Sequence, residues 1–476
     1  MFHGGQRGPK RALSLTKRRK DRNQEEGKVE PIQIVAGVIF IASVLALITG
    51  IVDSVIAALL GVFLMVMGRV MTEVEAFKYV DWNVICILLG IWVIAGYFGK
   101  TGIPEYLSSK ILRFSRGNIA IFVTLLGGLA GFISMFVDNV VVVLMMAPVV
   151  FTVTRQIKFP TFPAVIFIGL CANFMGTALL LGDLPPQMLH SVSGIEFAGF
   201  IWHSGRPSSF LILTATYLCV VAAFFFRFVK VYGPQAMPSG TKVDTTSRRL
   251  DHFVKDRPFT FIVLFYFLAT ILAMSLREKL GCHLGFIALV GATLLTLTLE
   301  IVGKRREMST PSFEEILAEL DWRAIFFYVS LFALVGGLEK VGIIKALADW
   351  LVPYLKQNLL LGFSLLYWAT VPIVGLVEHD AYILTFLYVI RDLGTHHGMN
   401  PWPLWWGLLW AGTLGSNLTI AGAPALFVAL NCSQKEDSCK ISLKEFLSYS
   451  VPYVLLSTGI CFILALLVWV LPFLRP

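Results

Sequence analysis

The sequence predicts an all-α polytopic membrane protein built from two inverted repeats, each with a re-entrant helical hairpin and a broken transmembrane helix. Three observations lead to this fold class: the composition, the series of long apolar segments and an internal duplication. Of the 476 residues, 57% are hydrophobic and 14% are charged, whereas soluble domains carry about 25% charged residues. The composition therefore argues against a water-soluble enzyme, a disordered protein and, despite the net charge of +9, a nucleic-acid-binding protein.

Apolar segments long enough to cross a bilayer follow one another along the chain, since a helix needs about 20 apolar residues to do so. After a basic polar tail (1–30), a first transmembrane repeat covers 31–229, with segments that start near residues 31, 52, 82, 118, 161 and 208. A polar linker (230–257) leads to a second repeat (258–476), with segments that start near residues 258, 283, 322, 357, 402 and 447. Four tryptophans are predicted to form an interfacial aromatic belt: Trp402, Trp405, Trp406 and Trp410.

The duplication appears as three separated matches at a constant offset of 240 positions. Asp81-Trp82 matches Asp321-Trp322, Val137-Asp138-Asn139 matches Val377-Glu378-His379, and Gly182 matches Gly422. Each half is predicted to cross the membrane an odd number of times, so we expect the halves to be inverted relative to each other. Duplicated halves are typical of secondary transporters, which build one site at the interface between the repeats.

A charged turn interrupts the long segment 118–154 and predicts the first hairpin. The turn contains Ser134, Asp138 and Asn139, and a carboxylate at the centre of a membrane helix costs at least about 2.5–3.5 kcal/mol. Asp138 could simply cap a helix at the turn. Both roles can hold together, because helix N-termini and a side-chain oxygen jointly form an ion site. We interpret Ser134, Asp138 and Asn139 as ligands of a transported ion.

Glycine and proline break two further apolar segments, one in each repeat. Asn173-Phe174-Met175-Gly176-Thr177 precedes Gly182-Asp183-Leu184-Pro185-Pro186, and Gly415-Ser416-Asn417-Leu418-Thr419 precedes Gly422 and Pro424. A broken helix frees backbone groups that protein, water or ligand must satisfy, and broken helices near the midplane form binding sites in transporters. A simple proline kink is the alternative. The candidate ligands are Gly176, Thr177, Gly182, Asp183, Ser416, Asn417 and Thr419.

The second hairpin has three consecutive ionisable residues, Glu378, His379 and Asp380. Because histidine titrates near neutral pH, we interpret them as a proton relay. A histidine satisfied by neighbouring carboxylates at a water-exposed turn is the alternative. By contrast, Asp81 and Asp321 begin apolar segments, where an acidic residue favours a helix N-terminus.

Cysteines give little indication of a site. Only Cys432 and Cys439 share a polar loop, and they could form a disulfide if that loop faces an oxidising space. The pattern does not favour a zinc site. No resident metal or other cofactor is expected, and the sequence contains no nucleotide-binding motif.

These motifs resemble the ion transporter superfamily, most closely the branch of arsenite efflux permeases, D-type sodium/proton antiporters and the melanosomal P protein. The resemblance lies in 136–148, 176–189, 321–343 and 415–425. It implies two inverted repeats, usually a dimer, and site positions at Asp138, Asn139, Thr177, Asp183, Asn417 and Thr419. The second hairpin departs from the family pattern, which often repeats an Asp-Asn pair where this chain has Glu378-His379-Asp380.

The carboxylate-transporting branch of that superfamily presents neutral Ser-Asn-Thr at its hairpin tips. Here the acidic residues of the motifs would repel an anion, so a small cation or a neutral oxyacid fits better. We therefore expect a transporter, not an enzyme, that exchanges a cation such as sodium for protons, is embedded in the lipid bilayer and forms a homodimer. The alternatives are an arsenite or related oxyanion efflux permease, with Cys171 as the only thiol close to a motif, or a degenerate transporter with a scaffold role.

Overall fold

The computed structural model describes residues 30–49, 52–115, 118–157, 159–232, 256–306, 310–376, 379–420, 422–438 and 440–474. The predicted tail up to residue 29, residues 233–255 of the predicted linker, Glu378 and Cys439 lie outside the described residues. The described chain is almost entirely helical, which confirms the all-α prediction. Two short strands, β1 (Trp202–His203) and β2 (Arg206–Pro207), pair antiparallel.

The first half contains the helices that precede the predicted linker. They are α2 (Pro31–Thr49), α3 (Ser54–Met67), α4 (Glu73–Tyr79), α5 (Trp82–Gly99), α6 (Ile103–Phe114), α7 (Ile119–Ser134), α8 (Asn139–Ile157), α9 (Thr161–Gly176), α10 (Leu184–Ser193), η1 (Phe197–Phe200) and α11 (Ser209–Tyr232). The predicted segment starts near residues 31, 52, 82, 118, 161 and 208 therefore lie within two residues of helix starts.

The second half repeats this order. It comprises α13 (Arg257–Ser275), α14 (Arg277–Leu280), α15 (Leu284–Arg306), α16 (Phe313–Glu319), α17 (Trp322–Lys340), α18 (Ile343–Gln357), α19 (Leu359–Leu376), α20 (His379–His397), α21 (Trp402–Ser416), α22 (Pro424–Asp437), α23 (Leu443–Ala465), η2 (Leu466–Val470) and α24 (Leu471–Leu474). Helices α8 and α20 begin and end 240 positions apart. Gly102 and Gly342, also 240 apart, precede α6 and α18 with φ of 74° and 79°. The duplication seen in the sequence therefore extends to the structure.

Two reciprocal ion pairs join the halves. Lys100, at the end of α5, lies 2.5 Å from Glu319, just before α17, and Lys340, at the end of α17, lies 2.5 Å from Glu75 in α4, just before α5. Helices α5 and α17 therefore run in opposite directions. This is the direction expected for inverted halves, and the inversion of the complete halves stays a prediction.

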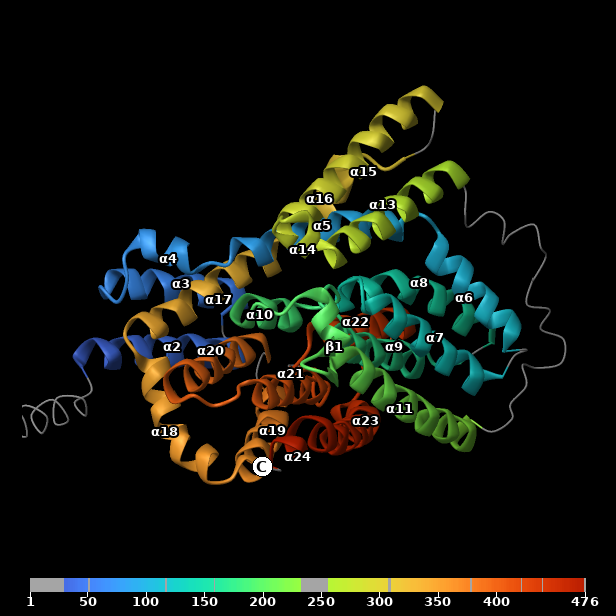
Figure 1. The fold of residues 1–476 in the computed structure, drawn as a ribbon. Coiled ribbons are helices and arrows are strands. Elements are labelled where there is room, and N and C mark those ends of the chain that lie inside the picture. Colours follow the sequence, from blue (N-terminus) through green and yellow to red (C-terminus); the bar gives the residue numbers. More distant parts are fainter. Residues whose placement is uncertain are drawn as a thin grey trace, which may run out of the picture.

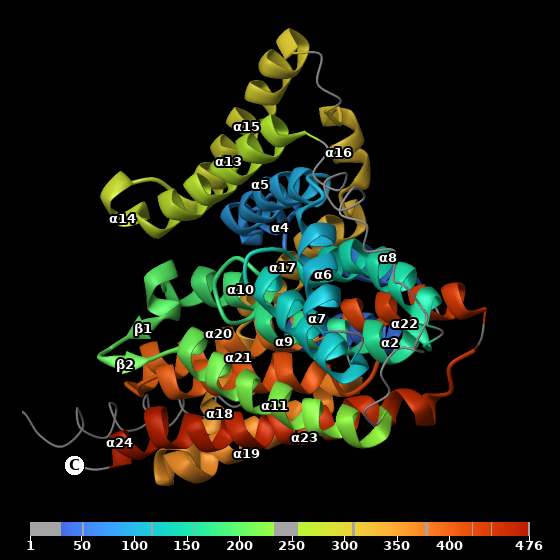
Figure 2. The same cartoon turned by 90° about the vertical axis from the view of Figure 1, so that its right-hand side faces the viewer.

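Within the described residues, seven helical stretches are long and apolar enough to cross a membrane: α5, α11, α13, α15, α17, α19 and the continuous stretch Leu443–Phe473. Helices α13 and α15 pack on α5 at one side of the molecule, and α11 packs on α23 at the other (Figures 1 and 2). The broken helices α9 and α21 lie between these layers. The hairpin and break regions of both halves therefore meet in the interior.

The prediction of an aromatic belt is wrong for three of its four tryptophans. Trp405, Trp406 and Trp410 are 5%, 0% and 0% exposed, whereas belt residues face the headgroups. The reason is the position of α21, which packs against α9, α19, α20 and α23. Trp410, for example, donates its indole N–H to the buried hydroxyl of Ser209 (3.0 Å). These rings are part of the protein core.

Candidate functional site

The first hairpin breaks between α7 and α8, and Asp138 occupies the end of the break. Its Oδ1 accepts hydrogen bonds from the backbone N–H groups of Val140 (2.9 Å) and Val141 (3.2 Å). Asp138 therefore caps α8, which is the structural role that the sequence left open. The carboxylate also lines the central cavity described below, so capping and access to a ligand coexist at this residue.

At Gly182, the main chain of the broken helix of the first half contacts the main chain of the first hairpin at its break. A Cβ added there would lie 2.1 Å from the carbonyl oxygen of Ser134 and 2.6 Å from that of Gly176. The second half repeats both contacts, because a Cβ at Gly422 would lie 2.7 Å from the carbonyl oxygen of Val374, in the second hairpin, and 2.3 Å from that of Ser416. Glycine is needed at both positions because each hairpin touches the main chain of its broken helix.

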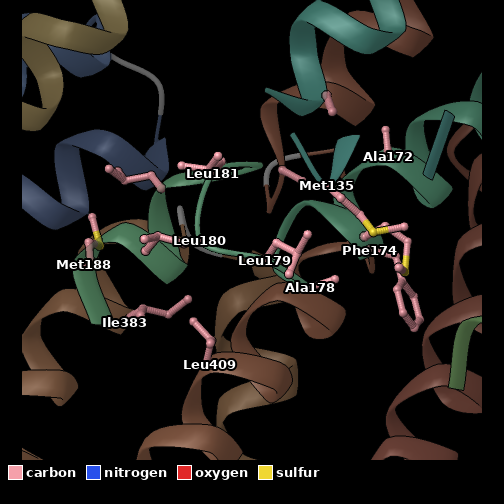
Figure 3. Close-up of a cluster of buried hydrophobic side chains, with 14 of the residues drawn as sticks. Met135, Ala172, Phe174, Ala178, Leu179, Leu180, Leu181, Met188, Ile383 and Leu409 are labelled. Carbon is pink, nitrogen blue, oxygen red and sulfur yellow. The ribbon is translucent and has the colours of Figure 1, made fainter. Parts of the chain in front are cut away.

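Apolar side chains hold the break between α9 and α10 in the interior. Figure 3 shows Ala178, Leu179, Leu180 and Leu181 on this segment, and all are at most 4% exposed. Met188, Ile383 and Leu409 are drawn in the same cluster. The non-helical backbone is thus buried within protein, as membrane depth requires.

A chain of side-chain amides links the first hairpin to both broken helices. Asn139 Nδ2 donates to Asp183 Oδ2 (3.0 Å) and to Asn173 Oδ1 (2.9 Å). Asn173 Nδ2 in turn lies within hydrogen-bond distance of Ser416 Oγ (3.0 Å) and Asn417 Oδ1 (3.1 Å). The structure therefore brings predicted residues of the two halves into one buried network, with Asn173 at its centre.

Three hydroxyls of the predicted set hold the broken helices in place. Thr177 Oγ1 lies 2.8 Å from Thr413 Oγ1 across the interface between the halves. Thr419 donates to the carbonyl oxygen of Gly375, at the end of α19. Ser416 Oγ donates to the carbonyl oxygen of Thr413 (2.8 Å). These residues connect the second hairpin, α21 and α9.

Two buried polar atoms of this region have no hydrogen-bond partner among the described residues: Ser134 Oγ and Asn417 Nδ2. Both side chains are fully buried. Leaving such groups unpaired costs about 1–3 kcal/mol each.

A cavity of about 700 Å³ lies beside this network. Polar and charged residues from both halves line it: Asp138, Asn139, Asp183, Asp321, His379 and Asp380. The exposed ion pair of Lys100 and Glu319 also lines it, so the cavity reaches the surface at that end. The carboxylates outnumber the one lysine of the lining, and this lysine is already paired. The cavity therefore favours positive charge.

The second hairpin contributes His379 and Asp380. His379 Nδ1 lies 2.9 Å from the carbonyl oxygen of Gly422, which can only accept, so this nitrogen carries the proton. His379 Nε2 then faces Asp380 Oδ1 at 3.4 Å. Both side chains are buried, which contradicts the alternative of a water-exposed turn at these two residues.

A comparison with protein families identifies the type of protein. The family model described as citrate transporter (CitMHS) matches residues 44–411, well over half of the chain. The chain belongs to the CitMHS citrate transporter family. It is therefore an integral, multi-pass membrane protein that transports a small molecule or ion, as the sequence predicted.

Relatives of this CitMHS-family chain are also transporters or membrane proteins. An uncharacterized transporter of Mycobacterium bovis is 26% identical, over 87% of this chain and 94% of the relative. The human P protein is 24% identical, over 92% of this chain and 60% of the P protein. The second match confirms the resemblance to the P protein branch.

Two solved structures share the fold. The YdaH transporter of Alcanivorax borkumensis has a TM-score of 0.53 at 14% identity, over 83% of this chain and 87% of that one. MtrF of Neisseria gonorrhoeae, from a class of antimetabolite efflux pumps, has a TM-score of 0.52 at 13% identity, over 94% of this chain and 96% of that one. At such identities the likeness concerns the fold alone.

Sequence reasoning missed two residues of the site in this CitMHS-family chain. Thr413 bonds Thr177, and Asp321 lines the cavity besides capping α17 through the N–H of Ala324. A signal for Thr413 existed, because it stands 240 positions after Asn173 in an apolar segment. Asp321 gave no such signal, since its position before a helix was explained by capping alone.

Proposed function

We propose that this transporter is proton-coupled and exchanges a small cation such as Na⁺ for protons. The observation that carries the proposal is the cavity lined by Asp138, Asp183 and Asp380. Carboxylate and carbonyl oxygens suit hard cations, and a carboxylate binds either a metal ion or a proton. Exchange then follows from competition of the two for one site.

In this proposal, Asp138 binds the cation or the proton. Asn139 keeps Asp183 in place through the bond from its Nδ2 and itself lines the cavity. Ser134, Gly176, Thr177, Gly182, Ser416, Asn417 and Thr419 shape the breaks behind this wall. His379 and Asp380, together with Glu378, form a second titrating group.

We also propose that residues 31–229 and 258–476 act as two inverted repeats around this site and that the chain forms a homodimer. The dimer is supported by the family resemblance. Multi-angle light scattering of the purified protein in detergent tests it. A mass of one chain after subtraction of the detergent would contradict the dimer while leaving the exchange reaction untouched.

The family description favours citrate as a rival substrate, and the charge of the cavity argues against it. A free citrate anion would face Asp138, Asp183 and Asp380 with only Lys100 as a lining lysine, and Lys100 is paired with Glu319. Arsenite gains no support from sulfur chemistry, because Cys171 is fully buried with its Sγ 3.8 Å from the hydroxyl of Tyr453. No cysteine is among the described residues that line the cavity.

Proton flux in proteoliposomes tests the proposal. A pH-sensitive dye inside the vesicles follows proton movement on addition of Na⁺, Li⁺, K⁺, citrate or arsenite. Asp138→Asn removes the charge but keeps an oxygen that caps α8, so the fold is retained. Asp349→Asn is the matched control, since Asp349 is exposed and pairs with His397 outside the cavity.

We expect cation-evoked proton movement in the wild type and in Asp349→Asn, and its loss in Asp138→Asn. Flux evoked by citrate or by arsenite alone would refute cation exchange and support the corresponding rival. Silence of the wild type with every solute would favour a degenerate transporter with a scaffold role.

A further inference from the structure

A second cavity lies outside the site and is lined by residues of α18, α19, α20 and α21. Its volume is about 490 Å³, and apolar side chains form nearly all of its lining. Leu365 and Ile373 of α19 line it and are 57% and 40% exposed. Because α19 is one of the helices long enough to cross the membrane, the cavity is a groove that opens toward the hydrocarbon of the bilayer.

We infer that this groove binds one acyl chain of a membrane phospholipid. This inference goes beyond the exchange reaction and does not depend on which ion is carried. An apolar groove open to hydrocarbon excludes water, and an acyl chain in it gains the dispersion contacts that an empty groove forfeits.

The dimensions of the groove match one leaflet. On α19 the lining residues run from Gly362 to Ile373, which is about 16 Å at about 1.5 Å per residue. On α20 they run from Tyr382 to Leu393, over the same length. Half of a hydrocarbon layer of roughly 30 Å is about 15 Å. The groove therefore has the length of one extended chain from a single leaflet.

One end of the groove has the chemistry of the membrane interface. Trp350 and Tyr354 of α18 line this end and are 61% and 55% exposed, and their rings contact each other at a tilt with centroids 5.5 Å apart. Aromatic rings with a polar atom favour the headgroup level, and α18 is amphipathic, as interfacial helices are. Gly362 approaches Leu355 of α18, so the headgroup lies at the Gly362 end and the acyl chain extends toward Ile373.

The first half has larger side chains at two of the corresponding positions. The residues 240 positions before Gly362 and Ala369 are Phe122 and Leu129, and Phe122 is buried in the core. In the second half, Leu355 fills the space beside Gly362, and the small side chain of Ala369 leaves its share of the volume to a ligand. The groove is therefore a feature of one half, and it borders the hairpin that carries His379 and Asp380.

Photo-labelling of the full chain in proteoliposomes tests this inference. The probe is a phosphatidylcholine with a diazirine in its acyl chain, and mass spectrometry maps the labelled residues. Ala369→Phe extends a side chain into the groove from an exposed position, so folding is preserved. Leu361→Phe is the matched control, since Leu361 is 55% exposed on the same helix and outside the groove lining. A free fatty acid with the same diazirine forms a second arm.

We expect labelling of groove residues on α19 and α20 several-fold above that of the lipid-facing residues of α11 and α13. Proteoliposomes of the two variants should differ in this labelling: Ala369→Phe should lose the enrichment, and Leu361→Phe should keep it. Even labelling of all lipid-facing helices, or unchanged enrichment in Ala369→Phe, would overturn the inference. Enrichment with the free fatty acid but not with the phospholipid would overturn the assignment to a phospholipid.

Discussion

Replacing Gly182 by alanine tests the backbone contact that joins the first hairpin to its broken helix. The added Cβ would lie 2.1 Å from the carbonyl oxygen of Ser134 and 2.6 Å from that of Gly176. Neither oxygen can rotate away, because both belong to the main chain. Overpacking typically costs about 1–3 kcal/mol, and two backbone contacts put this substitution at the upper end, at about 3 kcal/mol.

The assay is thermal unfolding of the purified protein in detergent, together with transport by the same preparation in proteoliposomes. Gly128→Ala is the control, since no atom lies within 4 Å of its added Cβ in α7. There alanine should be neutral or stabilising by up to about 1 kcal/mol. A Gly182→Ala protein that melts with the wild type and transports normally would refute the close approach of the two backbones.

Three further substitutions probe the site and the contacts between the halves. Asn139→Ala should lower the free energy of unfolding by about 1–3 kcal/mol, because two buried acceptors lose their donor, and an unchanged melting temperature would contradict the network. The hydrogen bond from Lys340 lowers the pKa of Glu75 from 4.5 to about 2. Glu75→Gln should therefore be less stable than the wild type by its full amount above pH 4.5, and this difference in the free energy of unfolding should vanish as the pH falls through about 2. His379→Asn retains an N–H donor for the Gly422 carbonyl but removes the imidazole nitrogen that faces Asp380, so cation-evoked proton movement should be lost while the melting temperature is kept; unchanged proton movement would remove His379 from the relay.

The sequence predicts those features of the structure that local chemistry determines. The helix breaks were predictable because glycine, proline and charged residues interrupt apolar segments, and the duplication indicated that the breaks of both halves meet. The contact of Asn173 with Asn417 was not predictable, because it depends on how α9 and α21 pack. The same packing buries Trp406, whereas an aromatic residue near a helix start reads equally well as a headgroup contact. Tertiary packing decided both outcomes.

The two halves share a backbone but not a set of site residues, and this difference explains how one cavity acquires its charge. Asp183 and Asn173 have Ala423 and Thr413 at the equivalent positions, so the bond between Asn139 and Asp183 has no counterpart in the second half. The second hairpin supplies an imidazole and a carboxylate instead. Two identical halves would place equal charges on both sides of their interface. Divergence at a few positions instead gives the single cavity two chemically different sets of lining residues. The first half contributes Asp138 and Asp183, the latter bonded by the amide of Asn139, and the second hairpin contributes His379 and Asp380. In the proposed exchange, this difference places a second pair of ionisable side chains beside the carboxylate for which the cation and the proton compete.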